Sequence, residues 1–453
     1  MDLSGIFKAY DVRGVFPDQI DTQAAHHIGA AFAVFAGSDR IAVGHDCRLS
    51  SPDLVASVVA GITSQGVDVA LLGPITTDAL YFAAGAWSLP GVMVTASHNP
   101  AEYNGLKFCL AGAAPVGEDS GLREIRRMAE SGLPEATATG EVAEVAVIDA
   151  YVDHLLGIVE ADSIGPLRVA VDGGNGMAGV AVPQVFDRLE AQLDPLYLEP
   201  DGTFPNHPAD PLRPENIADL LDLVARTSPD LAVAFDGDAD RAFFVDEAGV
   251  ALPGSTTTAI IAAWYLARRP GATIVHNLIC SRAVPETVRA GGGTPVRTRV
   301  GHSFIKEVMK ETGAVFGGEH SGHYYFEDHY RADSGILAML VLLRVMSDDG
   351  RPLSEIRRRY EPYAQSGEIN LEVADATTAM DRVAAGLPDR TPDLLDGLTI
   401  DLDEGAWFNL RPSNTEPLLR LNVEAATPER VAEVVALVTD LVVATEPAGG
   451  RHA

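Results

Sequence analysis

Short apolar runs alternate with longer amphipathic stretches along most of this chain, and this alternation limits the folds that it can adopt. Residues 41–44, 67–72 and 91–95 are predicted strands, and Ser51–Ser64, between the first two, is a predicted helix. A strand–helix–strand alternation is typical of parallel sheets that carry helices on their faces. The chain is therefore expected to be an α/β protein.

The chain is too long for one hydrophobic core, since single cores stop growing at about 250–300 residues and this chain has 453. The pattern predicts three similar α/β domains with mixed, largely parallel sheets at residues 1–145, 146–250 and 251–362. A Pro-containing linker is expected at residues 360–367, and a C-terminal α+β domain at 367–453. We expect the four domains to surround a central cleft, with the last domain as a lid.

Acidic residues outnumber basic ones by 64 to 33, so the net charge is −31. This charge argues against nucleic acid and anionic membrane as partners. No apolar run reaches transmembrane length, and the first residues lack the pattern of a signal peptide. Three cysteines without metal-ligand spacing indicate a reducing cytoplasm. The expected partners are small molecules, and the chain is expected to be a monomer or a homodimer.

Three aspartates at alternate positions, Asp236, Asp238 and Asp240, are followed by Arg241 and are the strongest metal-binding candidate. Carboxylate oxygens on a tight turn suit a hard cation such as Mg²⁺, with an oxygen of a substrate or a phosphoserine completing the shell. An acidic surface turn is the simpler alternative. An EF-hand is another, because Glu247 lies at the twelfth position. Arg241, however, stands where that loop needs glycine, and the flanking runs are predicted strands.

Ser97 lies in a polar turn between residues 95 and 100. A hydroxyl that holds and releases a phosphoryl group needs a divalent cation and a positive partner, and the triple-aspartate loop with Arg241 offers both. Lys107 is one of only four lysines and could hold a phosphate oxygen or carry a proton. An ordinary loop serine is the alternative. A Ser-His-acid hydrolase is disfavoured, because Ser97 and His98 are adjacent and no Gly-x-Ser-x-Gly elbow is present.

Ser97, Asp236 and Glu319 each follow a predicted strand. Open parallel sheets place their ligand sites at the carboxyl ends of strands, so these three side chains are expected to line one cleft. Glu319 and Ser321 are two positions apart and could grip two neighbouring hydroxyls of one ligand. His323 is a candidate acid or base because imidazole titrates near neutrality, with a structural role as the alternative.

Further candidates lie at both ends of the chain and before the Glu319 segment. His302 is a second candidate acid or base and could also bind an anion at a helix start. Arg13 stands on a glycine turn near the N-terminus. A late loop offers a guanidinium with hydroxyl and amide groups, which suits a phosphate unless it is a plain polar loop: Arg411, Ser413, Asn414 and Thr415. Its distance from the aspartates suggests a ligand with two ends.

Seven segments in chain order carry these candidates: residues 10–14, 95–100, 104–107, 236–241, 301–303, 318–323 and 411–417. Together they closely resemble the motifs of the α-D-phosphohexomutase family. The resemblance implies four domains, with Ser97 as phosphoryl carrier and Mg²⁺ held by the three aspartates and the phosphoserine. It also implies that Arg241 assists at the serine and that Glu319 and Ser321 bind the sugar. The resemblance also implies a distal phosphate site formed by Arg411, Ser413, Asn414 and Thr415. The residues that it implies along the active site are Arg13, His98, Lys107, His302 and His323.

The reaction implied by the resemblance moves phosphate between O6 and O1 of a hexose through a 1,6-bisphosphate, which also serves as activator. Asn414 favours the phosphomannomutase/phosphoglucomutase branch, since the phosphoglucosamine branch usually has glycine there. His320 departs from the methionine common in that branch. The alternatives are a phosphoglucosamine mutase, a metal-dependent sugar phosphatase and a sugar-phosphate sensor without activity.

Overall fold

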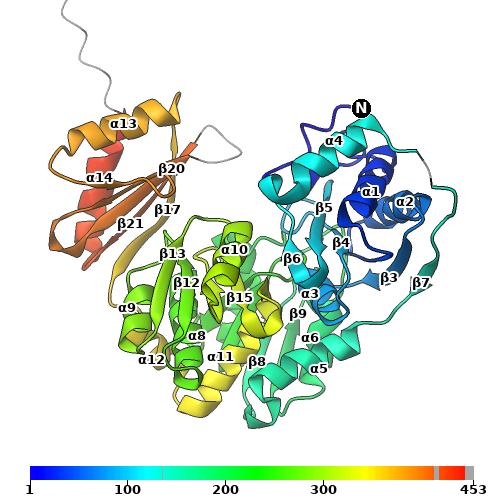
Figure 1. The fold of residues 1–453 in the computed structure, drawn as a ribbon. Helices are drawn as coiled ribbons and strands as arrows, with labels where there is room; N and C mark the ends of the chain where they lie inside the picture. The colour runs from blue at the N-terminus through cyan, green and yellow to red at the C-terminus, as the bar shows by residue number, and fades with distance from the viewer. Residues whose placement is uncertain (135, 413–417, 444–453) are drawn as a thin grey trace, which may run out of the picture.

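The computed structural model describes residues 1–134, 136–412 and 418–443, and these form four β-sheets with helices packed on them. Figure 1 shows four units that follow one another along an arc, and the last unit, in orange and red, stands across from the first, in blue. The predicted fold class is confirmed: α/β units with mixed sheets are followed by an α+β unit.

The first sheet has parallel strands on one side and antiparallel strands on the other. Its order is β1 (Val12–Val15), β5 (Tyr103–Leu110), β4 (Gly91–Val94), β2 (Arg40–His45), β3 (Asp68–Pro74) and β7 (Val142–Glu144), with β6 (Ala114–Pro115) beside β5. β4, β2, β3 and β7 run parallel. The helices of this unit are α1 (Thr22–Ala36), α2 (Ser51–Ser64), α3 (Thr77–Ala86) and α4 (Arg123–Ser131). Asp21 fixes the start of α1 by accepting a hydrogen bond from the Ala24 amide, and Gly37 ends it at a φ of 59°.

The second and third sheets also extend parallel strands with antiparallel ones. The second runs β11 (Ala242–Asp246), β10 (Leu231–Phe235), β8 (Arg168–Asp172) and β9 (Gln192–Leu196), with α5 (Ile148–Val159), α6 (Ala178–Phe186) and α7 (Ala218–Thr227). The third runs β13 (Thr294–Thr298), β12 (Thr273–Asn277), β14 (Phe316–Gly318), β15 (Tyr324–Phe326) and β16 (Ala332–Asp333). Its helices are α8 (Gly254–Arg268), α9 (Ala283–Ala290), α10 (His302–Thr312), α11 (Gly335–Asp349) and α12 (Leu353–Arg357).

The fourth sheet is antiparallel and carries α13 (Ala376–Gly386) and α14 (Pro428–Val443). Its order is β17 (Ala364–Glu372), β21 (Leu418–Ala425), β20 (Trp407–Pro412), β19 (Leu398–Asp401) and β18 (Pro392–Asp393). β17 begins inside the stretch that we expected to be a linker, so the connection is shorter than predicted. The start of β17 was not predicted because a register shift between Gln365 and Glu368 interrupts the alternation that marks a strand. Among the described helices, none is long and apolar enough to cross a membrane.

The first three units share one continuous hydrophobic core, whereas the fourth has a core of its own. Polar contacts connect the fourth unit to the third: the Arg282 amide donates to Glu424 over 3.0 Å, and Arg297 pairs with Asp393 at 2.7 Å. Units joined by a small polar interface move relative to one another more readily than units that share a core. The first three units therefore form a rigid base for the fourth.

A buried histidine in the shared core makes stability depend on pH. Burial lowers the pKa of His329 to about 3, helped by the nearby His154. Because this pKa lies below the value in the unfolded chain, the stabilisation is complete above about pH 6.5 and is lost as the pH falls. We expect His329→Phe to reduce the loss of unfolding free energy between pH 7.5 and pH 5 by about 2 kcal/mol, measured by urea unfolding at both pH values. An unchanged pH dependence would contradict this assignment.

Candidate active site

Ser97 lies in the turn after β4, at the carboxyl end of that strand. Its φ of 51° is in the left-handed region, which is uncommon for a residue with a side chain and often marks a functional turn. The side chain is buried, and Oγ donates to Oδ2 of Asp236, 2.8 Å away and 139 positions along the chain. Nδ1 of His98 lies 3.3 Å from the same Oγ, and burial holds the pKa of His98 well below its usual value. The hydroxyl is therefore aimed at the aspartate loop, beside a neutral imidazole.

Arg48 holds the serine loop in place. Its side chain is 1% exposed, and Nε donates to Asp46 over 3.1 Å. The rest of the guanidinium donates over 2.6 to 3.0 Å to four main-chain carbonyl oxygens of the loop: Ser97, Asn99, Pro100 and Tyr103. Our sequence analysis missed this residue. The available signal was its place just after the carboxyl end of β2, next to the strand that leads to the serine.

Replacement of Arg48 by lysine is expected to loosen this loop. A lysine ammonium has three donors and lacks the planar fork, so loop carbonyls would be left without partners. We expect kcat to fall by about 10- to 100-fold and the unfolding free energy by about 3 kcal/mol. Arg344→Lys is the matched control. Arg344, on α11, is also buried, but it pairs with Asp348 on the same helix and with Glu160, the residue that follows α5. Equal kcat values for the two variants would contradict the role of Arg48.

The triple-aspartate loop is the turn of a hairpin between the antiparallel strands β10 and β11. Strands on both sides exclude the EF-hand alternative. The side chains of Asp236, Asp238 and Asp240 belong to residues that are at most 1% exposed, which also excludes an acidic surface turn. The loop touches the serine loop directly, since a Cβ on Gly237 would lie 2.4 Å from the carbonyl oxygen of Ser97. Only glycine fits at this close approach.

Two cations balance the three buried carboxylates. Nζ of Lys107 donates to Oδ2 of Asp238 over 2.7 Å and to Oδ2 of Asp240 over 2.6 Å, and Nε of Arg241 donates to Oδ2 of Asp236 over 3.0 Å. Burial raises the pKa of Asp236 to about 7, with Arg241 opposing it. Burial acts in the same direction on Asp238, but the Lys107 ammonium outweighs it and lowers that pKa. The pKa values of Asp236 and Asp238 are thus shifted in opposite directions, although both carboxylates are buried in the same cluster.

The aspartate cluster keeps acceptor atoms that no protein group satisfies. Within the described part of the chain, Oδ1 of Asp238 and Oδ1 of Asp240 are buried without a hydrogen-bond partner. Such atoms are costly unless a ligand binds them. One ligand atom from each of the three aspartates lies within 4.8 Å of the others. The cluster can therefore hold a metal ion, and carboxylate ligands suit a hard divalent cation.

Glu319 directly follows β14 and is 2% exposed. Tyr325 donates its hydroxyl to Oε1 over 2.5 Å, and Asn277 donates to Oε2 over 3.1 Å. The Gly301 amide also donates to Oε2, over 3.3 Å. Ser321 is half-buried in the same turn. Sequence analysis missed Tyr325 and Asn277, although Tyr325 could have been found from its place two residues after His323 on a strand.

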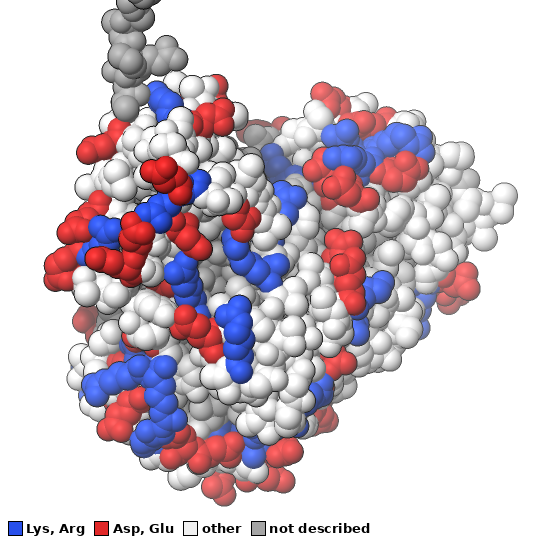
Figure 2. All heavy atoms as spheres, turned by 60° about the vertical axis from the view of Figure 1, so that its left-hand side comes forward, with Lys and Arg blue, Asp and Glu red and all other residues white. Residues whose placement is uncertain are grey.

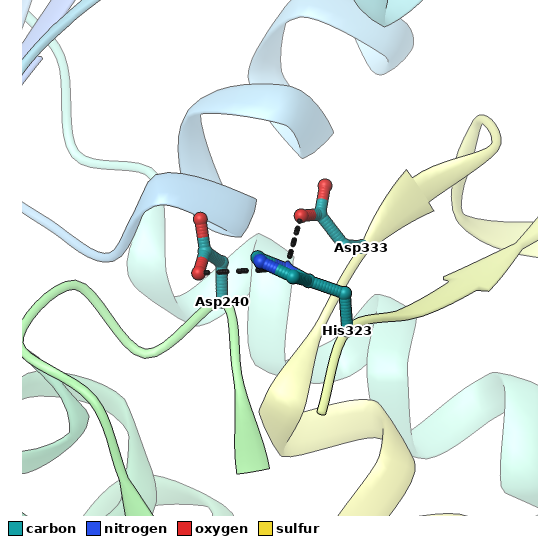
Figure 3. A group of neighbouring side chains, drawn as sticks. All are labelled: Asp240, His323 and Asp333. Atoms are coloured by element: carbon teal, nitrogen blue, oxygen red, sulfur yellow. Dashed lines mark ion pairs between the residues drawn. The ribbon is translucent and has the colours of Figure 1, made fainter. Parts of the chain in front are cut away.

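His323 links the third unit to the aspartate loop. Figure 3 shows its imidazole between two carboxylates, with Nδ1 3.0 Å from Oδ2 of Asp333 and 3.8 Å from Oδ1 of Asp240. Its main chain forms an isolated antiparallel bridge with Arg241. Burial opposes a charge on this imidazole, but the two carboxylates outweigh burial and raise the pKa of His323. The histidine, the aspartates and the serine therefore belong to one site.

Two of the remaining candidates, Arg13 and Arg411, have side chains that the structure describes. Arg13 donates over 2.5 Å to Oδ1 of Asn99 in the serine loop. Arg411 is buried, and its pKa is lowered by burial, with Glu368 3.3 Å away and Glu319 near enough to interact with its charge. Four predicted groups fall outside what the structure describes: the side chain of His302 and the residues Ser413, Asn414 and Thr415. Figure 2 shows Lys and Arg side chains grouped toward the middle of the face that carries the fourth unit, among acidic ones.

Comparison with known proteins accounts for this arrangement. Four domain models of phosphoglucomutase/phosphomannomutase match in succession: α/β/α domain I at residues 4–134, domain II at 149–249, domain III at 253–363 and the C-terminal domain at 368–441. The chain belongs to the phosphoglucomutase/phosphomannomutase family. The resemblance seen in the sequence is thereby confirmed, and the chain is a phosphomutase-type isomerase.

Relatives within this family are similar along nearly the whole length. The chain is 41% identical to "Phosphohexose mutases" of Xanthomonas campestris pv. campestris and 39% identical to a phosphomannomutase of Salmonella montevideo, over 92% of this chain and 94% of each relative. A crystal structure of a phosphoglucomutase/phosphomannomutase family protein from Burkholderia thailandensis superposes with a TM-score of 0.90 at 31% identity, covering 99% of both chains. The four-unit arrangement is thus the arrangement of the family.

Proposed function

We propose that this chain moves a phosphoryl group reversibly between O6 and O1 of a hexose phosphate, with mannose and glucose phosphates as substrates. The phosphoryl group would pass through a phosphoserine at Ser97 and a hexose 1,6-bisphosphate. The observation that carries the proposal is one carboxylate oxygen, Oδ2 of Asp236, which accepts from the Ser97 hydroxyl at 2.8 Å and from Arg241 at 3.0 Å. Nucleophile, anionic cluster and guanidinium therefore meet at one point, in a chain of the phosphomutase family.

The chain's own groups suit this chemistry. Transfer to a substrate breaks the bond between Ser97 Oγ and phosphorus and forms a bond from phosphorus to the sugar oxygen, whose proton must go to a base. Nη2 of Arg241 is buried without a hydrogen-bond partner among the described residues, so a donor is available for a phosphoryl oxygen. His323, with His98 and His302, would supply acid and base groups. Asp236, Asp238 and Asp240 would hold Mg²⁺, which neutralises charge on the transferring group when bound.

A ligand with two phosphate positions needs binding groups at both ends of the site. Glu319 and Ser321 would bind the sugar hydroxyls between those ends. The distal phosphate would be held by Arg411 together with Ser413, Asn414 and Thr415. Because the fourth unit has its own core and a polar interface with the third, it could close over the ligand and exclude water from the phosphoserine.

The test is an assay of the purified chain with Mg²⁺ and a trace of glucose 1,6-bisphosphate. Mannose 1-phosphate and glucose 1-phosphate are expected to give the corresponding 6-phosphates, with little release of inorganic phosphate. Release of inorganic phosphate without a 6-phosphate would favour a metal-dependent sugar phosphatase. Conversion of glucosamine 1-phosphate alone would favour a phosphoglucosamine mutase. Binding of the bisphosphate without any turnover would identify a sensor.

A further inference from the structure

Behind His323 lies a buried ion pair that the proposed chemistry does not use. Lys306, on α10, places Nζ 2.7 Å from Oδ1 of Asp333, at the end of β16. The other carboxylate oxygen of Asp333, Oδ2, lies 3.0 Å from Nδ1 of His323. One carboxylate thus contacts an ammonium group on one side and the imidazole on the other, as Figure 3 shows for the imidazole side.

This pair is deeply buried and enclosed by aromatic rings. Lys306 is 4% exposed and Asp333 is 2% exposed. Nζ of Lys306 lies 4.1 Å from the centre of the Tyr81 ring, which belongs to α3 of the first unit. Removing two charges from water costs more than their attraction usually returns, so a buried ion pair is poor evidence for a role in stability. Its retention is better explained by what the carboxylate does to the histidine.

The contacts of the imidazole are asymmetric. Nδ1 is buried and faces the carboxylates, while the side chain as a whole remains 19% exposed. The part of the ring that reaches the site is therefore the part away from Nδ1. A carboxylate beside one ring nitrogen favours a proton there and leaves the other nitrogen free to accept one.

The three side chains Asp240, His323 and Asp333 could also be taken for a metal site, since their ligand atoms lie close together. Asp240 also belongs to the cluster with Asp236 and Asp238, so a second metal ion here would have only His323 and Asp333 as ligands of its own. Two side-chain ligands are fewer than the three or four that a protein usually gives to a transition-metal ion such as zinc. The arrangement is that of an oriented acid–base residue.

We propose that Asp333, itself held by Lys306, is a positioning residue for His323 in phosphoryl transfer. It keeps the proton of the neutral imidazole on Nδ1, so that the opposite nitrogen accepts the proton of the attacking sugar hydroxyl. Lys306 fixes the carboxylate and prevents it from turning away. This inference rests on the proposed function, and it assigns to the third unit a carboxylate and an ammonium group that act only through the histidine.

The test compares Asp333→Asn, His323→Gln and the double variant with the unaltered chain, in the assay with mannose 1-phosphate, Mg²⁺ and trace bisphosphate. We expect Asp333→Asn to lower kcat by about 30-fold while KM changes less than about 3-fold, because positioned acid–base catalysis contributes about 100- to 10,000-fold. In the His323→Gln background the same substitution should change kcat less than about 2-fold, since residues that act through one another are not additive. Lys306→Met should lower kcat in the same direction.

Asp246→Asn is the matched control. Asp246 is as buried as Asp333 and likewise pairs with a basic side chain, that of Arg357, at 2.9 Å, but it contacts none of the groups of the site. Both aspartate variants are expected to lose thermal stability, and only Asp333→Asn to lose kcat.

The outcomes separate the two claims. An unaltered chain that gives no mutase turnover would overturn the proposed function and this inference together. With an active unaltered chain, only the inference would be overturned by an Asp333→Asn variant that keeps its kcat. The inference alone would also be overturned if Asp333→Asn lowers kcat as much in the His323→Gln background as in the unaltered chain.

Discussion

Replacement of Ser97 by alanine is expected to lower kcat for mannose 1-phosphate by at least about 1,000-fold, because in the proposed mechanism this serine is the covalent nucleophile and the phosphoserine cannot form without it. The structure gives the physical reason. The Ser97 hydroxyl is the group that contacts Asp236 in the aspartate cluster, and its backbone is fixed in the left-handed region by the loop.

One measurement and one control variant distinguish loss of chemistry from loss of structure. Intact-protein mass spectrometry after incubation with glucose 1,6-bisphosphate should show one added phosphoryl group on the unaltered chain and none on Ser97→Ala. Ser347→Ala is the control, because the Ser347 hydroxyl donates to the Leu343 carbonyl inside α11, away from the site. Full turnover by Ser97→Ala would remove this serine from the mechanism.

Removal of divalent cations with EDTA is expected to lower turnover by at least about 100-fold, and added Mg²⁺ should restore it. Three buried carboxylates face two directly bonded cations, and two of their oxygens have no hydrogen-bond partner among the described residues. A divalent cation would supply the missing charge. It would also reduce the repulsion between this cluster and a phosphorylated Ser97.

Asp240→Asn is expected to weaken Mg²⁺ binding by at least about 10-fold in isothermal titration, since it removes one charged ligand of three. Asp246→Asn should leave Mg²⁺ binding unchanged, because that carboxylate pairs with Arg357 instead. Turnover that survives EDTA treatment, or equal Mg²⁺ affinities for the two variants, would contradict the assignment of the metal site to the aspartate loop.

Elements with strong local signals were predictable from the sequence. The helix Ser51–Ser64 has the bounds that the pattern predicted. The strands predicted at 41–44, 67–72 and 91–95 are β2, β3 and β4, with ends that differ by at most two residues. The start of β17 was not predictable, because its register shift breaks the alternation. Arg48 and Asp333 also escaped notice. The carbonyl groups that Arg48 holds are 49 or more positions away in the sequence, and Asp333 is ten positions from His323. A single charged residue gives no local sign of partners at such separations.

The sequence by itself determined the chemical inventory of the site: a serine after a strand, three alternating aspartates with an arginine, and a glutamate before a histidine. Each of these depends on residues a few positions apart, where backbone geometry and side-chain periodicity decide which side chains point to the same side. Only the tertiary structure decided which atoms meet. The contact between Ser97 and Asp236 spans 139 positions, and that between Lys107 and Asp238 spans 131. Such contacts depend on how separate sheets pack against one shared core, and no local pattern specifies that packing.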